Sequence, residues 1–424
     1  MLAISETNVC ARYESEVRTY CRSIPLEFAE AENALLKTTR GEEYIDFLSG
    51  CGSLNYGHND PDMKDALMKY MAHNGIAHSL DMTTKSKNDF VSAFVDCVLA
   101  PRQMDFKIQF TGPTGTNAVE AALKLARKIT GRSNVVAFTN GFHGVSLGAL
   151  AATGNGYHRG AAGIALTGVS RFPYDGYLGP EIDTIDLLER MLADQSSGID
   201  LPAAFLVETV QGEGGLNAAT PNWLNRLRRL ADRHSALLII DDVQAGCGRT
   251  GTFFSFEGTR VVPDIVVLAK SLSGFGLPLA AVLIRRELDV WRPGEHNGTF
   301  RGNNHAFVTA TTALRKYWAD DSFARKICER AAVVDAALIS LSAKTGWQPK
   351  GRGLFRGLRT PSTQIAANIQ KTALANGVVI EVCGPDDEVL KLMPPLTIED
   401  DILEDGLRRF TAAVLITENF RAVA

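Results

Sequence analysis

The middle of the chain alternates short apolar runs with longer stretches in which apolar residues recur at helical spacing. The short runs are rich in β-branched residues and nearly free of polar ones: Val135–Thr139, Ala204–Glu208, Leu237–Asp241, Ile265–Ala269 and Leu279–Ile284. Such continuous apolar runs are typical of parallel strands that are buried on both faces. The stretches between them, such as Ala118–Ile129 and Trp223–His234, are amphipathic. We therefore predict an α/β fold whose mostly parallel sheet carries helices on both faces.

The pattern changes after about residue 318. A long helical stretch over Ala319–Ser342 precedes Gly351–Leu358, which we expect to form a strand pair or the start of a strand. Helical patterns over Thr363–Asn376 and Ile402–Thr417 follow. We predict a large domain over residues 56–318 and a smaller α+β domain over residues 319–424. Residues 1–55 carry only short apolar segments and no strand of the main sheet, so we expect them to pack with the smaller domain.

Composition narrows the class of protein. A chain of 424 residues suits two or three structural units at about 150 residues each. The net charge of −4 argues against a partner with a phosphate backbone, which clustered Lys and Arg would hold. No apolar run approaches the roughly 20 residues of a membrane span, and the N-terminus lacks the apolar core of a signal peptide. The sequence therefore predicts no nucleic-acid and no membrane partner.

The cysteines point to a reducing compartment. There are seven, they are scattered, and none forms a C-x-x-C pair. An odd, dispersed set is typical of free thiols in a cytoplasmic protein rather than of a disulfide framework or a zinc site. We expect a cytoplasmic protein without a metal centre.

Ligands of parallel α/β sheets bind at the carboxyl ends of the strands, so candidate chemistry is expected there. The segment TGPTGTN over Thr111–Asn117 opens the helix Ala118–Ile129, whose apolar face holds Val119, Ala122, Leu123 and Ala126. Free N–H groups and the positive end of the helix dipole make such a turn a seat for an anion. Taken alone, the segment is better explained as a plain helix cap formed by Thr or Asn.

A second candidate follows the strand Leu237–Asp241, in the segment LLIIDDVQAGCGRTG. A carboxylate at a buried strand end is costly unless it meets a cation or several donors. Asp241 could face a protonated ring nitrogen. The alternative is that Asp241 or Asp242 caps the next turn or pairs with Arg249.

A third candidate is Lys270, which follows another apolar strand in the segment DIVVLAKSLSGFG. Lysine is rarely buried without a partner, and partial burial lowers its pKa and makes it usable for Schiff-base chemistry. The alternative is a lysine whose ammonium extends to solvent at a strand end.

A fourth candidate is the turn NGFHG, which follows the strand Val135–Thr139. Phe142 and His143 could stack on a flat ring, although a loop aromatic that covers the core is the simpler explanation for a single Phe. The four candidates together supply an anion seat, a ring clamp, a partner for a pyridinium nitrogen and a reactive amine. Pyridoxal 5′-phosphate requires all four, so we predict this cofactor.

At this point the sequence resembles the class III aminotransferases, a fold-type I family that uses pyridoxal phosphate. The likeness extends from YIDFLSGCGSLNYGHNDP to EVLKLMPPLTI, and DDVQAGCGRTG is similar to the family's D-E-V-Q-x-G-x-G-R-T-G. It implies a large domain with a seven-stranded sheet and a small domain built from both termini. Lys270 would then form the aldimine, and Asp241 would hold the pyridinium nitrogen.

The resemblance also implies roles around the cofactor. Gln244 would bond the ring hydroxyl, Val243 and Phe142 would cover the two ring faces, and Gly115 and Thr116 would bind the phosphate. His143 and Glu208 are placed among the cofactor-binding residues on the same basis. Thr299, in HNGTFRGN, matches a threonine that reaches the phosphate of the neighbouring subunit. That match implies a homodimer with shared active sites, and a tetramer is the alternative assembly.

Two positions depart from the family pattern. Asn117 stands where many members carry Glu, and the second departure concerns the partner of Glu213. Glu213, in VETVQGEGG, matches a glutamate that pairs with a mobile arginine, but the arginine position is occupied by Lys391 in KLMPPL. Lysine lacks the two-pronged guanidinium that suits a carboxylate. Lys391 could bind the substrate carboxylate more weakly, or Arg301 could assist it.

Within the family, the motifs are most similar to the diaminobutyrate–2-oxoglutarate subgroup. This implies ping-pong transamination between L-glutamate/2-oxoglutarate and L-aspartate 4-semialdehyde/L-2,4-diaminobutyrate, as used in ectoine or siderophore biosynthesis. The alternatives are another ω-aminotransferase, acting on ornithine, acetylornithine or 4-aminobutyrate, or an aminomutase. A ligand-binding scaffold that keeps the fold without the chemistry is the alternative from a different class.

Overall fold

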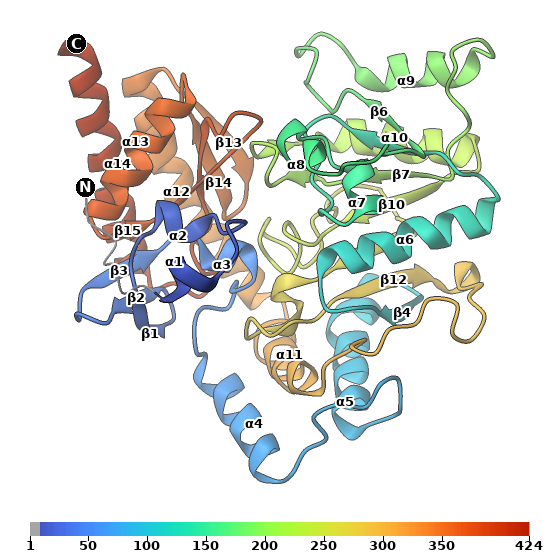
Figure 1. The fold of residues 1–424 in the computed structure, drawn as a ribbon, viewed down its shortest axis with the longest axis horizontal. Coiled ribbons are helices and arrows are strands. Elements are labelled where there is room, and N and C mark those ends of the chain that lie inside the picture. Colours follow the sequence, from blue (N-terminus) through green and yellow to red (C-terminus); the bar gives the residue numbers. More distant parts are fainter. Residues whose placement is uncertain (1–8, 424) are drawn as a thin grey trace.

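The computed structural model describes residues 9–423, and it centres on one seven-stranded sheet (Figure 1). The strands follow the spatial order β4 (Phe106–Phe110), β12 (Ala281–Arg285), β11 (Ile265–Leu268), β10 (Leu237–Asp241), β7 (Ala204–Val207), β5 (Val135–Phe138) and β6 (Val169–Phe172). From β11 to β6 every neighbouring pair is parallel. This confirms the predicted α/β class with a mostly parallel sheet.

Strand β12 runs against the others, although its sequence resembles theirs. It pairs antiparallel with both β11 and β4. The connection from β11 to β12 holds only the short 3₁₀ helix Lys270–Ser273, whereas a parallel return requires a longer crossover, usually through a helix. The edge strands β4 and β6 were not predicted, because FKIQF and VSRF contain polar residues within the strand.

Helices cover the faces of this sheet, and the longest of them near the site is α6 (Gly115–Thr130). All four residues of its predicted apolar face are buried, together with Ala118, Ala121 and Leu125. They share one core cluster with Ile239 of β10 and Val267 of β11. Helix α6 is therefore held firmly on the sheet, and its N-terminus is fixed near the strand ends.

Helix α10 (Pro221–Arg233) is amphipathic, as predicted for Trp223–His234, and buries Trp223, Leu224, Leu227, Leu230 and Ala231. The other helices of this part are α4 (Pro61–Ala72), α5 (Lys85–Phe94), α7 (Leu147–Ala152), α8 (Gly156–Gly160), α9 (Thr184–Ala193) and α11 (Asn304–Tyr317). A two-stranded ribbon, β8 (Val210–Gln211) with β9 (Asn217–Ala218), follows β7.

Two smaller sheets lie to the side of the large one (Figure 1). One contains β1 (Phe28–Glu32), β2 (Leu35–Thr38), β3 (Glu43–Asp46) and β15 (Val378–Val379). The other contains β13 (Gln348–Arg352), β14 (Phe355–Arg359), β17 (Val389–Leu392) and β16 (Glu381–Cys383). Because β3 pairs in parallel with β15, the N-terminal strands lie beside the C-terminal part of the chain. The boundaries at residues 55 and 319 stay a proposal.

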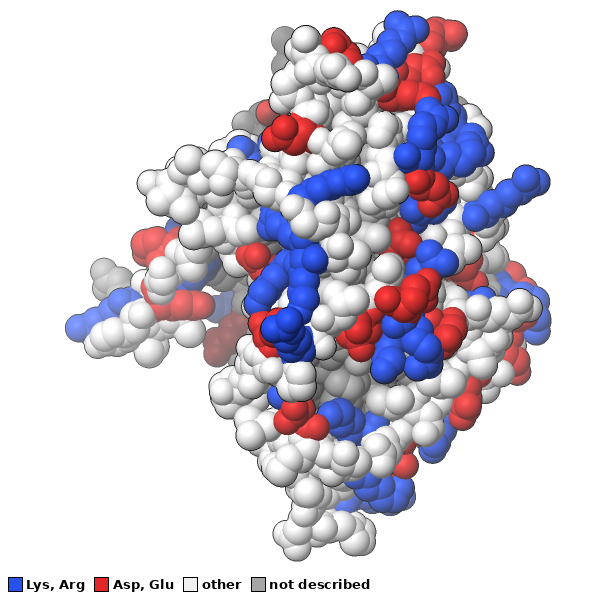
Figure 2. All heavy atoms as spheres, turned by 90° about the vertical axis from the view of Figure 1, so that its right-hand side faces the viewer, with Lys and Arg blue, Asp and Glu red and all other residues white. Residues whose placement is uncertain are grey.

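The remaining helices of this side unit are α12 (Ser322–Thr345), α13 (Thr363–Ala375) and α14 (Asp400–Val423), with the short α1 (Val9–Tyr13), α2 (Tyr20–Ser23) and α3 (Ser49–Gly52) near the N-terminus. No helix among residues 9–423 is long and apolar enough to cross a membrane. On the face shown in Figure 2, basic side chains are interspersed with acidic ones. This mixture agrees with the small net charge.

Candidate active site

The carboxyl ends of four neighbouring strands bring most of the predicted site residues together. Asp241 ends β10, Glu208 follows β7, and the NGFHG turn follows β5. Lys270 follows β11 and has a φ of 52°, a left-handed conformation that is uncommon for any residue except glycine. Strained backbone of this kind is often held at functional sites, where the surrounding structure fixes it.

Asp241 and His143 form a buried pair. The Nδ1 of His143 lies 2.7 Å from the Oδ2 of Asp241, and both residues are almost completely inaccessible to solvent. Burial opposes protonation of the imidazole, but the hydrogen bond and the charge of Asp241 outweigh it and raise the pKa of His143. The second oxygen of Asp241 accepts a long bond of 3.2 Å from the backbone N–H of Val243. His143 thus contacts the carboxylate directly.

Glu208 fixes the backbone of the NGFHG turn. Its carboxylate accepts hydrogen bonds from the N–H groups of Phe142 and Gly212, at 2.9 and 3.2 Å. Burial raises the pKa of Glu208 to about 7, with the nearby charge of Asp241 adding to the rise. The ring of Phe142 stays half-exposed and meets the ring of His158 edge-on. Glu208 therefore positions Phe142.

The N-terminus of α6 has the features of an anion seat. Thr114 caps the helix by accepting from the N–H of Asn117. Within the described chain, no acceptor is found for the N–H groups of Gly115 and Thr116. A Cβ added at Gly115 would lie 2.9 Å from a methyl group of Val243, so only glycine fits between the helix and the strand end. Two free donors at the positive end of a 16-residue helix suit a phosphate.

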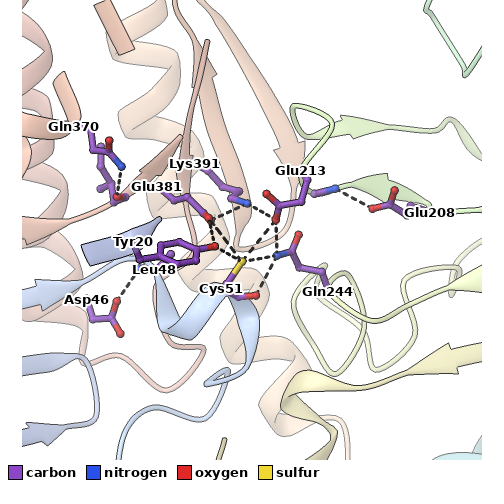
Figure 3. A network of polar contacts seen from close by, with 12 residues as sticks. Tyr20, Asp46, Leu48, Cys51, Glu208, Glu213, Gln244, Gln370, Glu381 and Lys391 are labelled. Carbon is purple, nitrogen blue, oxygen red and sulfur yellow. Dashed lines mark hydrogen bonds and ion pairs between the residues drawn. The ribbon is translucent and has the colours of Figure 1, made fainter. Parts of the chain in front are cut away.

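Gln244 connects the strand ends to the side unit. Its amide Nε2 donates to Oε1 of Glu213 and to the carbonyl of Cys51, both at 3.1 Å. Figure 3 shows Gln244 and Glu213 on one side of the Cys51 thiol, with Glu381 and Tyr20 on the other. The backbone of Glu213 is also tied to the side unit, because the N–H of Gly384 donates to its carbonyl at 2.9 Å.

Lys391 lies at the centre of this network and is fully buried. Its Nζ is 2.9 Å from Glu213 and 2.8 Å from Glu381 (Figure 3). The hydroxyl of Tyr20 donates to the other oxygen of Glu381 at 2.8 Å. The pairing of Lys391 with Glu213 is the one that the family resemblance suggested. The contributions of Glu381, Cys51 and Tyr20 were not predicted, because none of them belongs to a recognised motif.

The charges of the network are set by burial and by mutual attraction. Burial opposes the charged form of Lys391, but the two carboxylates outweigh it and raise the pKa of its ammonium. Burial would likewise raise the pKa of Glu213, yet Lys391 and Lys270 lower it to about 2. Burial raises the pKa of the Cys51 thiol and of the Tyr20 hydroxyl, so both stay neutral near pH 7.

Thr299 and Arg301 lie outside this network. The carbonyl of Thr299 is 2.9 Å from Nε2 of His78, and its side chain is exposed. Arg301 pairs with Asp81 and lines a separate cavity of about 530 Å³. A single chain therefore does not bring Arg301 to Lys391.

The site residues fit pyridoxal phosphate better than they fit a metal ion. Cys51, Glu213 and Glu381 place one potential ligand atom each within 4.8 Å of one another. However, the Lys391 ammonium already bonds both carboxylates, so a cation is present there. The free N–H groups of α6, the buried Asp241 and the strained, half-buried Lys270 instead match a phosphate, a ring nitrogen and an aldehyde.

Comparisons with known proteins agree with this chemistry. The family described as aminotransferase class-III matches residues 18–414. A diaminobutyrate–2-oxoglutarate transaminase from Halalkalibacterium halodurans is 52% identical over 422 residues, covering 99% of this chain and 97% of the relative. One from Vibrio parahaemolyticus is 53% identical, covering 96% and 97%.

Solved structures show the same architecture. An ornithine aminotransferase from Toxoplasma gondii, whose structure has partial occupancy of PLP at the active site, superposes with a TM-score of 0.84 and 27% identity. The superposition covers 97% of this chain and 94% of the other. A transaminase from Virgibacillus has the same fold, with a TM-score of 0.87, 20% identity, and coverage of 97% and 99%.

Proposed function

Because the chain belongs to the class III aminotransferase family, we propose that it transfers an amino group between L-glutamate and L-aspartate 4-semialdehyde, giving 2-oxoglutarate and L-2,4-diaminobutyrate. The cofactor is pyridoxal 5′-phosphate. The observation that carries the substrate assignment is the 52–54% identity, over nearly the full length, to several transaminases of that name.

When bound, the cofactor supplies an aldehyde for amino-group exchange and a ring that delocalises the electrons left by proton removal. Lys270 is proposed to hold it covalently through Nζ. Once released, the same amine moves a proton at the substrate carbon, acting first as base and then as acid. The strained backbone at Lys270 keeps this amine at the strand ends.

The other residues hold and orient the cofactor. Asp241 is proposed to accept from the ring nitrogen through the oxygen that His143 leaves free. Gln244 would bond the ring hydroxyl, and Val243 and Phe142 would cover the two ring faces. Gly115 and Thr116 would donate their N–H groups to the phosphate. The position of Asp241, Val243 and Gln244 at and after the end of β10, near the N-terminus of α6, supports these roles.

One pocket must accept two different substrates. Glutamate reacts at its α-carbon and presents two carboxylates, whereas diaminobutyrate reacts at its terminal carbon and presents an amino-acid head group. A Glu213 side chain that leaves Lys391 would expose the ammonium to a substrate carboxylate, and its return would cover it. The side chain of Glu213 is 30% exposed and that of Lys391 is 0% exposed, so Glu213 is the partner with room to move.

We further propose a homodimer in the cytoplasm. The exposed Thr299 lies away from the network around Lys391, and the resemblance assigns it to the neighbouring subunit's phosphate. A threonine with that role requires a second chain. The seven cysteines are all free, which suits a reducing compartment.

A donor panel with glutamate formation as the readout tests the substrate assignment. We expect diaminobutyrate to exceed ornithine and 4-aminobutyrate, with strict dependence on 2-oxoglutarate and the parallel-line kinetics of a ping-pong reaction. An aminomutase would turn over without 2-oxoglutarate, and another ω-aminotransferase would prefer a different donor. Either result would contradict the proposal.

Replacing Lys270 tests the covalent role. Lys270→Ala should abolish turnover and remove the visible absorbance of the lysine-bound cofactor. Lys350→Ala is the matched control, because Lys350 is another half-buried lysine, and its Nζ donates to Asn217 away from the strand ends of β10 and β11. Borohydride trapping followed by peptide mapping should place the cofactor on Lys270. An adduct on another lysine would overturn the assignment.

A further inference from the structure

Glu381 adds a second carboxylate to the buried pair of Glu213 and Lys391. Glu381 and Lys391 are directly opposite one another on the antiparallel strands β16 and β17. The sheet therefore fixes this pair, since residues in such register have Cβ atoms about 5 Å apart. Glu213 comes from the loop between β8 and β9 and is held to the lysine by its side chain alone.

The formal charges leave an excess of negative charge. Two carboxylates, Glu213 and Glu381, share the ammonium of Lys391, while Cys51 and Tyr20 are neutral. Lys270 also attracts Glu213, but in the proposed function its amine is committed to the cofactor and the substrate carbon. A buried, uncompensated carboxylate is costly, and a further cation in contact with the network relieves that cost. If Glu213 turns away, the Lys391 ammonium becomes accessible to a carboxylate, but Glu381 still balances its charge.

This electrostatic arrangement favours one kind of substrate. A 2,4-diamino acid carries an ammonium beside its carboxylate in addition to the amine that reacts. An ω-amino acid such as 4-aminobutyrate lacks that second ammonium, and a dicarboxylate such as 2-oxoglutarate carries two negative charges. We propose that Glu381 is a specificity-determining residue that selects donors with a second ammonium by making the network negative. The inference rests on the proposed function and refines it.

The decisive experiment compares two donors that differ only in that ammonium. Glu381→Gln keeps the size of the side chain and an acceptor for Tyr20 and Lys391, but removes the charge. The ratio of kcat/KM for diaminobutyrate to that for 4-aminobutyrate should fall about 10- to 100-fold, the usual range for a lost interaction with a charged group. The KM for 2-oxoglutarate should also fall, because less negative charge repels the dianion.

Two further variants separate charge from folding. Glu381→Asp keeps the charge and should retain most of the preference. Glu388→Gln is the matched control, because Glu388 precedes β17, the strand that carries Lys391, but pairs with the exposed Arg359. Its donor ratio should equal that of the wild type. An unchanged ratio in Glu381→Gln, with cofactor still bound, would overturn the inference while the proposed function stood. A wild-type enzyme without a preference for diaminobutyrate would instead overturn the proposed function.

Discussion

Asp242, the neighbour of Asp241, is a buried acid with few partners among the described residues. Its Oδ2 accepts from the N–H of Ser255 at 3.0 Å, and within the described chain its Oδ1 has no partner. Burial raises the pKa of Asp242 to about 7, and Asp241 adds to the rise. The folded state therefore favours the neutral acid, whereas the unfolded chain loses this proton near pH 4. Folding stability should decrease as the pH rises from about 4 to 7.

Asp242→Asn tests this pH dependence. The amide cannot ionise, so the loss of stability between pH 5 and pH 8 should become smaller, by up to about 3 kcal/mol, because about two pH units of the shift lie in that window. Thermal unfolding of the wild type and the variant at the two pH values measures the difference. Asp96→Asn, an exposed aspartate, should keep the wild-type slope. Equal slopes in all three proteins would show that Asp242 does not titrate in this range.

At the scale of elements, helix α6 can pack closely against the end of β10 because residue 115 is a glycine, which has no side chain. Gly115→Ala would push a methyl group to 2.9 Å from Val243. Overpacking of this kind costs about 1–3 kcal/mol and should displace the phosphate donors, so we expect weaker cofactor binding. Titration of the apoprotein with cofactor measures the loss.

Two variants show whether that loss comes from the contact with Val243. Gly160→Ala is the control, because no atom lies within 4 Å of the added Cβ. The double variant Gly115→Ala/Val243→Ala should regain part of the affinity, since the clash is removed. Additive losses in the double variant would mean that the two residues act separately.

Elements with strong local patterns could be predicted from the sequence, and contacts between distant elements could not. The strand Leu237–Asp241 has the predicted bounds, and α6 buries the predicted face. The direction of β12 depends on its connection to β11, which the apolar pattern of β12 does not encode. Glu381 and Lys391 meet only through the register of β16 and β17, and a register shift of one residue would have turned them to opposite faces.

At the scale of the whole molecule, Arg249 ties the large sheet unit to the side unit. This fully buried guanidinium donates to Asn55 and to the carbonyls of Leu354 and Pro394. Burial lowers the pKa of Arg249 to about 9. The DDVQAGCGRTG motif thus contains a structural arginine, which pairs with neither Asp241 nor Asp242 in the structure.

Arg249→Met should destabilise the protein strongly. The variant leaves the Asn55 oxygen and two buried carbonyls without donors, at a cost of about 1–3 kcal/mol each. We expect the Tm to fall by roughly 5–10 °C or more. Arg325→Met, on an exposed site, is the control and should leave the Tm within about 2 °C. A small effect at Arg249 would mean that water replaces the lost donors.

The proposed dimer can be tested by complementation. Lys270→Ala and Thr299→Ala chains with different tags are co-expressed, and the heterodimer is purified through both tags. If Thr299 serves the neighbouring site, one site in each heterodimer has both native residues, so about half of the wild-type activity should return. If Thr299 serves its own site, both sites are damaged and the heterodimer should stay as weak as the Thr299→Ala homodimer.

The bond from the Gly384 N–H to the Glu213 carbonyl has a consequence for protein engineering. It fixes the backbone of the β8–β9 loop to the end of β16, so the acid can rotate while its main chain stays in place. In a chimaera that received residues 381–391 from a relative, the transplanted strands would no longer match the native β8–β9 loop that they contact. A successful graft of this pocket must therefore transfer both segments together.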